Sequence, residues 1–159
     1  MSNGLVKAEI TNVDDEREKV VCMFNPREYT FTKQNNWTED RNKGADVGRL
    51  EFGGGSPAKL SLQLFFDTYE AHYHGGRQLN QAGDDVRRYT RALWNMMKVS
   101  ERKRNQTTGR GEPPHVRFTW GALWSFEAVI ESISQKFTLF LNDGTPVRAT
   151  LDVSFKQIV

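Results

Sequence analysis

The sequence has almost none of the features that brace a protein with disulfides or hold it in a membrane. Its single cysteine, Cys22, lies inside an apolar run and has no second thiol to pair with, which predicts a buried thiol. No apolar run approaches the ~18 residues of a membrane span. Residues 1–10 alternate polar with apolar side chains and do not resemble a secretion signal. These absences favour synthesis and assembly in the cytoplasm.

Charge of one sign is also scarce. The chain has 159 residues with 22 Lys and Arg against 20 Asp and Glu, so its net charge is +2 and does not by itself indicate a nucleic-acid or acidic-membrane partner. Hydrophobic residues make up 37%, including 10 Phe, 4 Trp and 4 Tyr. This composition excludes a disordered chain and suffices for one packed domain.

Alternation with a period of two residues predicts that most of the chain is β. Leu60, Leu62, Leu64 and Phe66 share one side of a predicted strand, and residues 147–155 show the same alternation. Five further segments rich in β-branched or aromatic residues are predicted strands: 5–10, 20–24, 29–33, 115–120 and 126–141.

The turn at residues 142–144 fixes the register of the last predicted hairpin. A three-residue loop with Gly144 in the left-handed conformation keeps apolar residues together, whereas a two-residue loop mixes the two faces. The three-residue loop places Leu139 opposite Val147 and Phe137 opposite Ala149. Each strand then exceeds the usual ~5 to 6 residues. We therefore expect this hairpin to project beyond the core and contact a neighbour.

Only one segment repeats at helical spacing. Val86, Tyr89 and Leu93, followed by Met96 or Met97, predict one amphipathic helix over residues 84–99. Asp84 or Asp85 is the expected N-terminal cap. The polar or glycine-rich stretches 35–57, 71–83 and 100–114 are predicted loops.

No motif with the spacing of a catalytic, cofactor or metal site occurs. His72 and His74 are one residue apart but lack nearby ligands, so a solvated loop is favoured over a metal site. Residues 53–56 resemble a phosphate cradle without its lysine, and Cys22 has no partner base in its local sequence. We expect no enzyme, cofactor or metal, and the alternative is a small hydrolase or metalloprotein built around His72 and His74.

A basic segment spans residues 87–110, which contain eight Lys or Arg and only one acidic residue, Glu101. Its local charge is +7, which favours a solvated helix face or an acidic protein neighbour. A nucleic-acid-binding β-barrel that uses this segment is the alternative function. The residues expected to face a partner are Arg87, Arg88, Arg91, Lys98, Arg102, Lys103 and Arg104.

Five segments in a fixed order carry a family resemblance. They are 23–29 (Met-Phe-Asn-Pro-x-Glu-Tyr), 62–69 (Leu-x-Leu-Phe-Phe-Asp-Thr-Tyr), 85–90 (Asp-Val-Arg-x-Tyr-Thr), 113–121 (Pro-Pro-x-Val-x-Phe-x-Trp-Gly) and 140–149 (Phe-Leu-x-Asp-Gly-x-Pro-Val-Arg-Ala). Over residues 5–158 the chain resembles the tube-like N-terminal domain of the LysM-containing tube and baseplate proteins of contractile injection systems, the phage-tail-like particles.

The resemblance implies a structural, non-enzymatic role. The expected fold is mainly β with one α-helix, a tail-tube or Hcp-like β-barrel or sandwich with the helix at its flank. Its members form a hexameric ring that joins the spike or baseplate hub to the inner tube, or that begins the tube. The implied partners are copies of itself, inner tube subunits, the trimeric spike or hub protein and baseplate proteins, with no nucleic acid and no membrane contact.

The resemblance and the residues together give the expected domain and interface. Family members usually continue into a LysM domain, whereas this chain stops at Val159, so we expect a single tube-like domain over residues 1–159. Trp120 and Trp124 flank Gly121 beside a turn, where large aromatics serve either as core lids or as interface anchors. The candidate interface residues are Phe65, Trp120, Trp124, Asn142, Asp143, Gly144 and Arg148.

Overall fold

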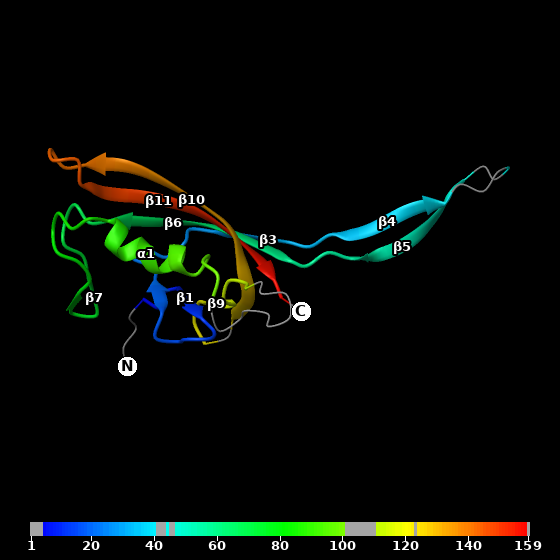
Figure 1. The fold of residues 1–159 in the computed structure, drawn as a ribbon, viewed down its shortest axis with the longest axis horizontal. Helices are drawn as coiled ribbons and strands as arrows, with labels where there is room; N and C mark the ends of the chain where they lie inside the picture. The colour runs from blue at the N-terminus through cyan, green and yellow to red at the C-terminus, as the bar shows by residue number, and fades with distance from the viewer. Residues whose placement is uncertain (1–4, 41–43, 45–46, 101–110, 123, 159) are drawn as a thin grey trace.

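The fold is built on one large antiparallel sheet (Figure 1). The computed structural model describes residues 5–40, 44, 47–100, 111–122 and 124–158. Within them, seven strands pair in the order β2-β1-β9-β10-β11-β6-β3. Their bounds are β1 Glu9–Asn12, β2 Lys19–Val21, β3 Tyr29–Thr32, β6 Lys59–Asp67, β9 Val116–Thr119, β10 Ser125–Phe140 and β11 Pro146–Gln157.

Two small hairpins and one helix complete the described structure. Strands β4 (Asn35–Asp40) and β5 (Arg49–Gly55) form an arm that extends away from the body, and β7 (Tyr73–His74) pairs with β8 (Arg77–Gln78) (Figure 1). The helix α1 spans Arg87–Asn95. The predicted fold class, mainly β with one helix, is confirmed. No helix in the described part of the chain is long and apolar enough to cross a membrane.

The hydrophobic core lies on one face of the large sheet. On β6 the side chains at positions 60, 62, 64 and 66 are buried while those between them are exposed, as the alternation predicted. Strand β11 follows the same pattern, and Phe155 approaches Phe118 of β9 to 6.4 Å between ring centroids. Leu93 of α1 and Met96 close this core.

The sheet is open within the described residues, so the barrel form of the expectation is not observed. Strands β2 and β3 are its two edges. The segment that connects β2 to β3 makes one isolated β-bridge with β6, between Phe24 and Phe65. One bridge is too short a ladder to close seven strands into a barrel.

Helix α1 is shorter at both ends than the predicted range 84–99. Its N-cap is Val86, whose side chain makes no capping hydrogen bond. Asp84 is used in the preceding turn, where its carboxylate accepts the Gln81 N–H at 2.9 Å. Asp85 accepts the N–H of the first helical residue at 2.9 Å and so supports the first turn from outside. The helix ends at its C-cap, Met96.

The predicted three-residue turn at residues 142–144 is confirmed. The Leu141 N–H donates to the Thr145 carbonyl at 2.8 Å, which closes the loop. Gly144 has φ +91°, in the left-handed region that favours glycine.

The predicted cross-strand register of this hairpin is confirmed at one pair and wrong at the other. Phe137 pairs with Ala149 as expected, but Leu139 pairs with Arg148 and not with Val147. Register shifts on both sides of Leu139 explain the difference, since the second shift restores the register that the first one displaced.

The prediction of a loop over residues 35–57 is wrong, because β4 and β5 occupy most of it. Glycines 53–55 suggested a loop, yet they lie inside β5, and Gly55 pairs with Asn35 of β4. The predicted loop over residues 71–83 is interrupted only by the short strands β7 and β8. Gly75 and Gly76, both with positive φ, form the turn between β7 and β8. Of the predicted loop 100–114, residues 101–110 lie outside the described residues.

Candidate functional site

Four strands of the sheet form a ladder with two free edges. In the order β3-β6-β11-β10, each strand is antiparallel to the next. Strand β9 covers β10 only at residues 125–128, so the rest of that edge of β10 has no partner strand among the described residues. Among the described residues, β3 pairs only with β6. The ladder therefore presents an unpaired backbone edge on each side.

Hydrogen-bond alternation shows which backbone groups these edges present. The Thr68 N–H donates to the Val147 carbonyl at 2.8 Å in the register of the β6–β11 ladder. Because antiparallel partners alternate between bonded and non-bonded pairs, the Phe31 N–H of β3 points away from β6. The same alternation turns the N–H groups of Ile133 and Gln135 away from β11. Among the described residues these N–H groups face no partner strand, and free N–H groups of this kind are able to bind an added strand.

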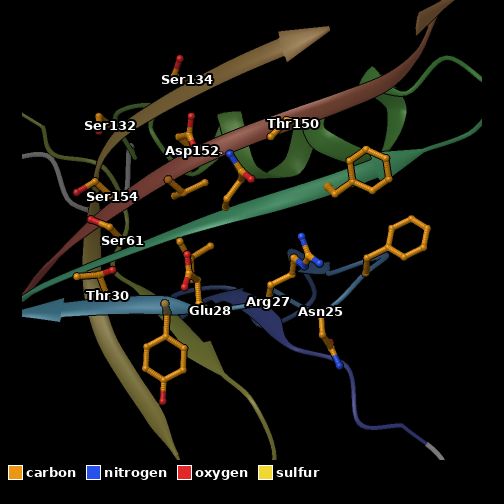
Figure 2. A pocket seen from close by; sticks show the side chains of 16 residues that line it. Asn25, Arg27, Glu28, Thr30, Ser61, Ser132, Ser134, Thr150, Asp152 and Ser154 are labelled. Atoms are coloured by element: carbon orange, nitrogen blue, oxygen red, sulfur yellow. Dashed lines mark hydrogen bonds between the residues drawn. The ribbon is translucent and has the colours of Figure 1, made fainter. Parts of the chain in front are cut away.

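The solvent face of the ladder is polar and hollowed. A cavity of about 810 Å³ lies on it, and small hydroxyl side chains line it together with charged residues (Arg27, Glu28 and Asp152) and aromatic residues (Phe24, Tyr29 and Phe65). Figure 2 shows Thr30, Ser61, Ser132 and Ser154 gathered from four strands. Asp152 accepts a hydrogen bond from the Gln63 amide at 3.0 Å. The lining presents hydroxyl groups without the nucleophile and base in contact that catalysis requires.

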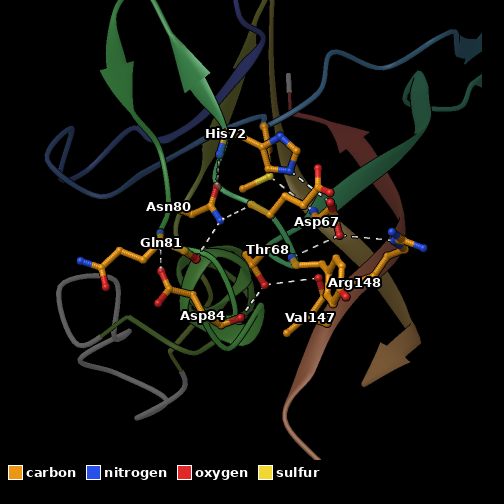
Figure 3. Close-up of polar contacts among 11 residues, drawn as sticks. Asp67, Thr68, His72, Asn80, Gln81, Asp84, Val147 and Arg148 are labelled. Carbon is orange, nitrogen blue, oxygen red and sulfur yellow. Dashed lines mark hydrogen bonds and ion pairs between the residues drawn. The ribbon is translucent and has the colours of Figure 1, made fainter. Parts of the chain in front are cut away.

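A buried carboxylate ends this ladder at the last residue of β6. The oxygens of Asp67 contact His72 Nε2 at 3.1 Å and Arg148 Nε at 3.4 Å (Figure 3). The predicted interface residue Arg148 is therefore half-buried and already bound to Asp67. His72 uses one ring nitrogen for this carboxylate, and in the described part of the chain no three His, Cys, Asp or Glu residues come together around it or His74.

Two buried polar residues hold the connection between β6 and α1 in place. Asn80 accepts the His72 N–H at 3.0 Å and donates to the Glu70 carbonyl at 2.9 Å (Figure 3). The Thr68 hydroxyl donates to the Asp84 carbonyl. Neither Asn80 nor Thr68 was predicted to have this role, because each binds backbone groups that only the fold brings near.

The predicted aromatic anchors lie in different surroundings. Phe65 is exposed on the polar face beside Phe24, with 5.3 Å between ring centroids. Trp120 and Trp124 are half-buried against the core. Trp124 stacks on Tyr29 at 5.0 Å. Both tryptophans contact the core and keep part of their surface exposed, and Phe65 is exposed on the sheet face.

The tip of the β10–β11 hairpin is exposed, whereas part of the basic segment is already paired with acids. Residues 142–144 are exposed. Arg87 contacts Asp85 at 2.6 Å and Arg88 contacts Asp84 at 3.5 Å, so two of the predicted partner-facing cations already pair with acids. Arg91 and Lys98 line a groove beside α1. The remaining three, Arg102, Lys103 and Arg104, lie outside the described residues.

Two pKa shifts follow from these contacts. A hydrogen bond from the Tyr89 hydroxyl is the main reason that the pKa of Asp84 lies below its ordinary value. Burial raises the pKa of Cys22 to about 12, which keeps the thiol protonated and unsuited to nucleophilic chemistry.

Comparison with protein families gives one match, which covers nearly the whole chain. Residues 4–159 match the family described as contractile injection system tube protein. No curated protein matches the chain.

Proposed function

Because the chain belongs to the contractile injection system tube protein family, we propose that it forms a hexameric ring that joins the spike or baseplate hub to the inner tube or begins that tube. Members of this family are structural proteins and not enzymes. The chain is accordingly a structural component of a contractile injection particle. The number six and the place in the particle come from the resemblance to the LysM-containing tube and baseplate proteins.

The observation that carries the proposal is the pair of free edges on one ladder. Strand direction alternates along β3-β6-β11-β10, so β10 of one copy lies antiparallel to β3 of the next when the two edges meet. Repeating this contact around a ring pairs β3 of each copy with part of the free edge of β10 in the next copy. An antiparallel seam also continues the hydrogen-bond pattern already present within each copy.

The two faces of the ladder suggest how each copy is oriented in the ring. The core and α1 cover one face, and the hydroxyl-lined hollow lies on the other. A closed ring has room for the bulk of each copy only on its outside, so the hollow polar face turns toward the axis. The channel would then be lined by residues such as Ser61, Ser134 and Ser154.

The proposed partners bind at the two ends of the ring and around it. We assign inner tube subunits, the trimeric spike or hub protein and baseplate proteins to these contacts on the basis of the resemblance. The tip of the β10–β11 hairpin projects past the end of the sheet (Figure 1), which makes Asn142, Asp143 and Gly144 candidates for an axial contact. Phe65, exposed near the same end of β6, is a second candidate.

Two substitutions of Phe31 test the ring. Phe31→Pro and Phe31→Ala both remove the aromatic ring, but only proline also removes the N–H that β3 presents at its free edge. We expect native mass spectrometry over a concentration series to show hexamers for the parent and for Phe31→Ala, and few or none for Phe31→Pro. Monomers of the parent at every concentration, with and without spike and tube partners, would refute the ring.

Titration with oligonucleotides separates this function from the nucleic-acid alternative. Arg87 and Arg88 are already paired with acids, which reduces the positive charge that the segment offers to phosphates. We therefore expect no tight binding of single- or double-stranded oligonucleotides at moderate salt. Submicromolar affinity that falls steeply with salt concentration would favour the alternative.

A further inference from the structure

The tip of the β10–β11 hairpin contains the only Asp-Gly pair in the sequence, Asp143 and Gly144. Both residues are exposed, and the tip projects past the end of the sheet (Figure 1). An Asp-Gly pair is prone to rearrange, because glycine has no side chain to keep its amide nitrogen away from the preceding carboxyl group. The pair is therefore a candidate for spontaneous modification of the backbone.

The rearrangement joins the Gly144 nitrogen to the Cγ atom of Asp143. As this bond forms, the carboxyl OH leaves with the amide proton as water, and the product is a five-membered imide ring. A water molecule then opens the ring. When it attacks the main-chain carbonyl carbon of residue 143, the original peptide bond breaks and the chain continues through the side chain as isoaspartate. One water is lost and one is gained, so the mass of the chain is unchanged.

The closed turn occupies both reacting groups. The Gly144 N–H donates to the Leu141 carbonyl at 2.9 Å, so it points at the main chain and not at the Asp143 carboxyl group. The Asp143 Oδ1 atom accepts the Thr145 N–H at 2.9 Å. Each of these hydrogen bonds opposes the geometry that ring closure needs.

The contacts of Asp143 also keep its carboxyl group in the less reactive form. Ring closure uses the protonated group, because a neutral carboxyl group releases an oxygen as water far more readily than a carboxylate does. Hydrogen bonds from the backbone N–H and the side chain of Thr145 hold the pKa of Asp143 below its ordinary value. At neutral pH the protonated form is therefore scarcer in the closed turn than in an open chain.

Opening of the tip removes both kinds of protection at once. The turn is exposed and lies at the end of two long strands, so it opens locally without unfolding of the core. We propose that Asp143 is a latent site of isoaspartate formation, which the closed turn protects and which reacts when the tip opens.

The modification changes the length of the loop. Isoaspartate adds one carbon atom to the backbone between Leu141 and Thr145, whose hydrogen bond closes the loop at 2.8 Å. A loop whose register depends on its length does not keep this bond and the Gly144 turn unchanged. The inference concerns a single chain and is independent of the proposed ring.

Peptide mapping of the folded and the unfolded protein tests the protection. The parent is incubated at neutral pH for equal times with and without guanidinium chloride, and is then digested with trypsin. Residues 137–148 form one tryptic peptide, in which Asp143 is the only aspartate. Isoaspartate appears as a second chromatographic peak of this peptide with unchanged mass, whereas deamidation of Asn142 changes the mass.

We expect the second peak to form more slowly in the folded protein by on the order of tenfold, the factor that two turn hydrogen bonds supply. Equal rates in the folded and the unfolded protein would overturn the protection. No second peak in the unfolded protein would overturn the site itself.

Two substitutions of Thr145 separate the turn from general unfolding. Thr145→Pro removes the N–H that Asp143 accepts, whereas Thr145→Ala keeps this N–H and removes only the side chain. With the body shown to be folded by circular dichroism, we expect the proline variant to form isoaspartate about three- to tenfold faster than the alanine variant, the factor for one hydrogen bond. Equal rates in the two folded variants would overturn the role of the turn. If the proline variant does not fold, the two rates of the parent decide.

Asp143→Glu verifies which residue gives the second peak. The longer side chain of glutamate would have to close a six-membered ring, which forms more slowly, so the peak should be absent from this variant. A second peak of unchanged mass from Asp143→Glu would place the rearrangement at another residue and overturn the assignment to Asp143.

Discussion

Replacing Gly144 with valine probes the turn of the β10–β11 hairpin through the backbone alone. A Cβ atom at this position meets no atom within 4 Å, so there is space where the side chain begins. The cost comes from holding a β-branched residue at φ +91°. Such strain costs about 1 to 3 kcal/mol per residue.

The strain has two ways to be relieved, and they give different results. If the turn keeps its conformation, the full cost appears as lower stability, and each kcal/mol lowers the melting temperature by roughly 2 to 4 °C for a domain of this size. If the turn changes, the hydrogen bond from Leu141 to Thr145 is lost and the end of the hairpin shifts register. Because residues 142–144 are exposed, the second outcome leaves the core intact.

We expect Gly144→Val to reduce ring formation more than it reduces the stability of the monomer. Urea denaturation measures the stability, and native mass spectrometry measures the rings. Gly144→Asn is the matched control, because asparagine enters the left-handed region more readily than other non-glycine residues. Rings that form from the valine variant as readily as from the parent, with stability unchanged, would show that the turn does not require a glycine.

Three further predictions concern buried or titrating groups. Thr68→Val removes buried hydroxyl hydrogen bonds and should cost about 1 to 2 kcal/mol in urea denaturation, whereas Thr150→Val on the polar face should change stability by less than about 0.5 kcal/mol. Cys22 should react with Ellman's reagent only after unfolding, because burial raises its pKa to about 12, and fast reaction of the native protein would contradict its burial. The pKa of Asp84 is lowered in the folded state, so its stabilising contribution is present above about pH 4 and is lost as the pH falls through the folded value. Removing the main cause with Tyr89→Phe should raise that pKa in an NMR titration, and an unchanged value would refute the assignment.

The strands of the core followed from the sequence because burial on one face imposes a two-residue period. Strands β6 and β11 each have a solvated face, so buried apolar residues alternate along them with exposed or half-buried ones, most of which are polar. The period also predicted the Phe137–Ala149 pair. It did not predict Leu139 opposite Arg148, because a bulge changes register without changing the alternation on either side.

The arm was missed because its pattern is interrupted at the base. Glycines 53–55 lie in β5, and the register shifts between Asn35 and Trp37, so the alternation of Trp37, Leu50 and Phe52 is short. Glycine is uncommon in strands, which made a loop the better sequence interpretation. Pairing with β4 is a property of two segments together and has no signature in either one.

The candidate surfaces were predicted only in part. The long final hairpin indicated an unpaired edge, and the structure shows that β9 stops after covering four residues of β10. The role of α1 as one wall of a groove depends on Gln135 and Phe137, which come from a strand far along the chain. No local pattern in the helix sequence reports which strand will lie beside it.

The order of strands along the chain affects when this protein can assemble during its synthesis. Strand β6 emerges from the ribosome well before β10 and β11, yet β11 is its neighbour in the sheet. Pairings between distant segments form slowly, and strands that wait for their partners are exposed to aggregation. Since the β10 edge is also made late, an incomplete chain presents β3 without the strand that would receive it in another copy. If copies meet through the proposed β3–β10 seam, two unfinished chains that lack β10 would be unable to form it with one another.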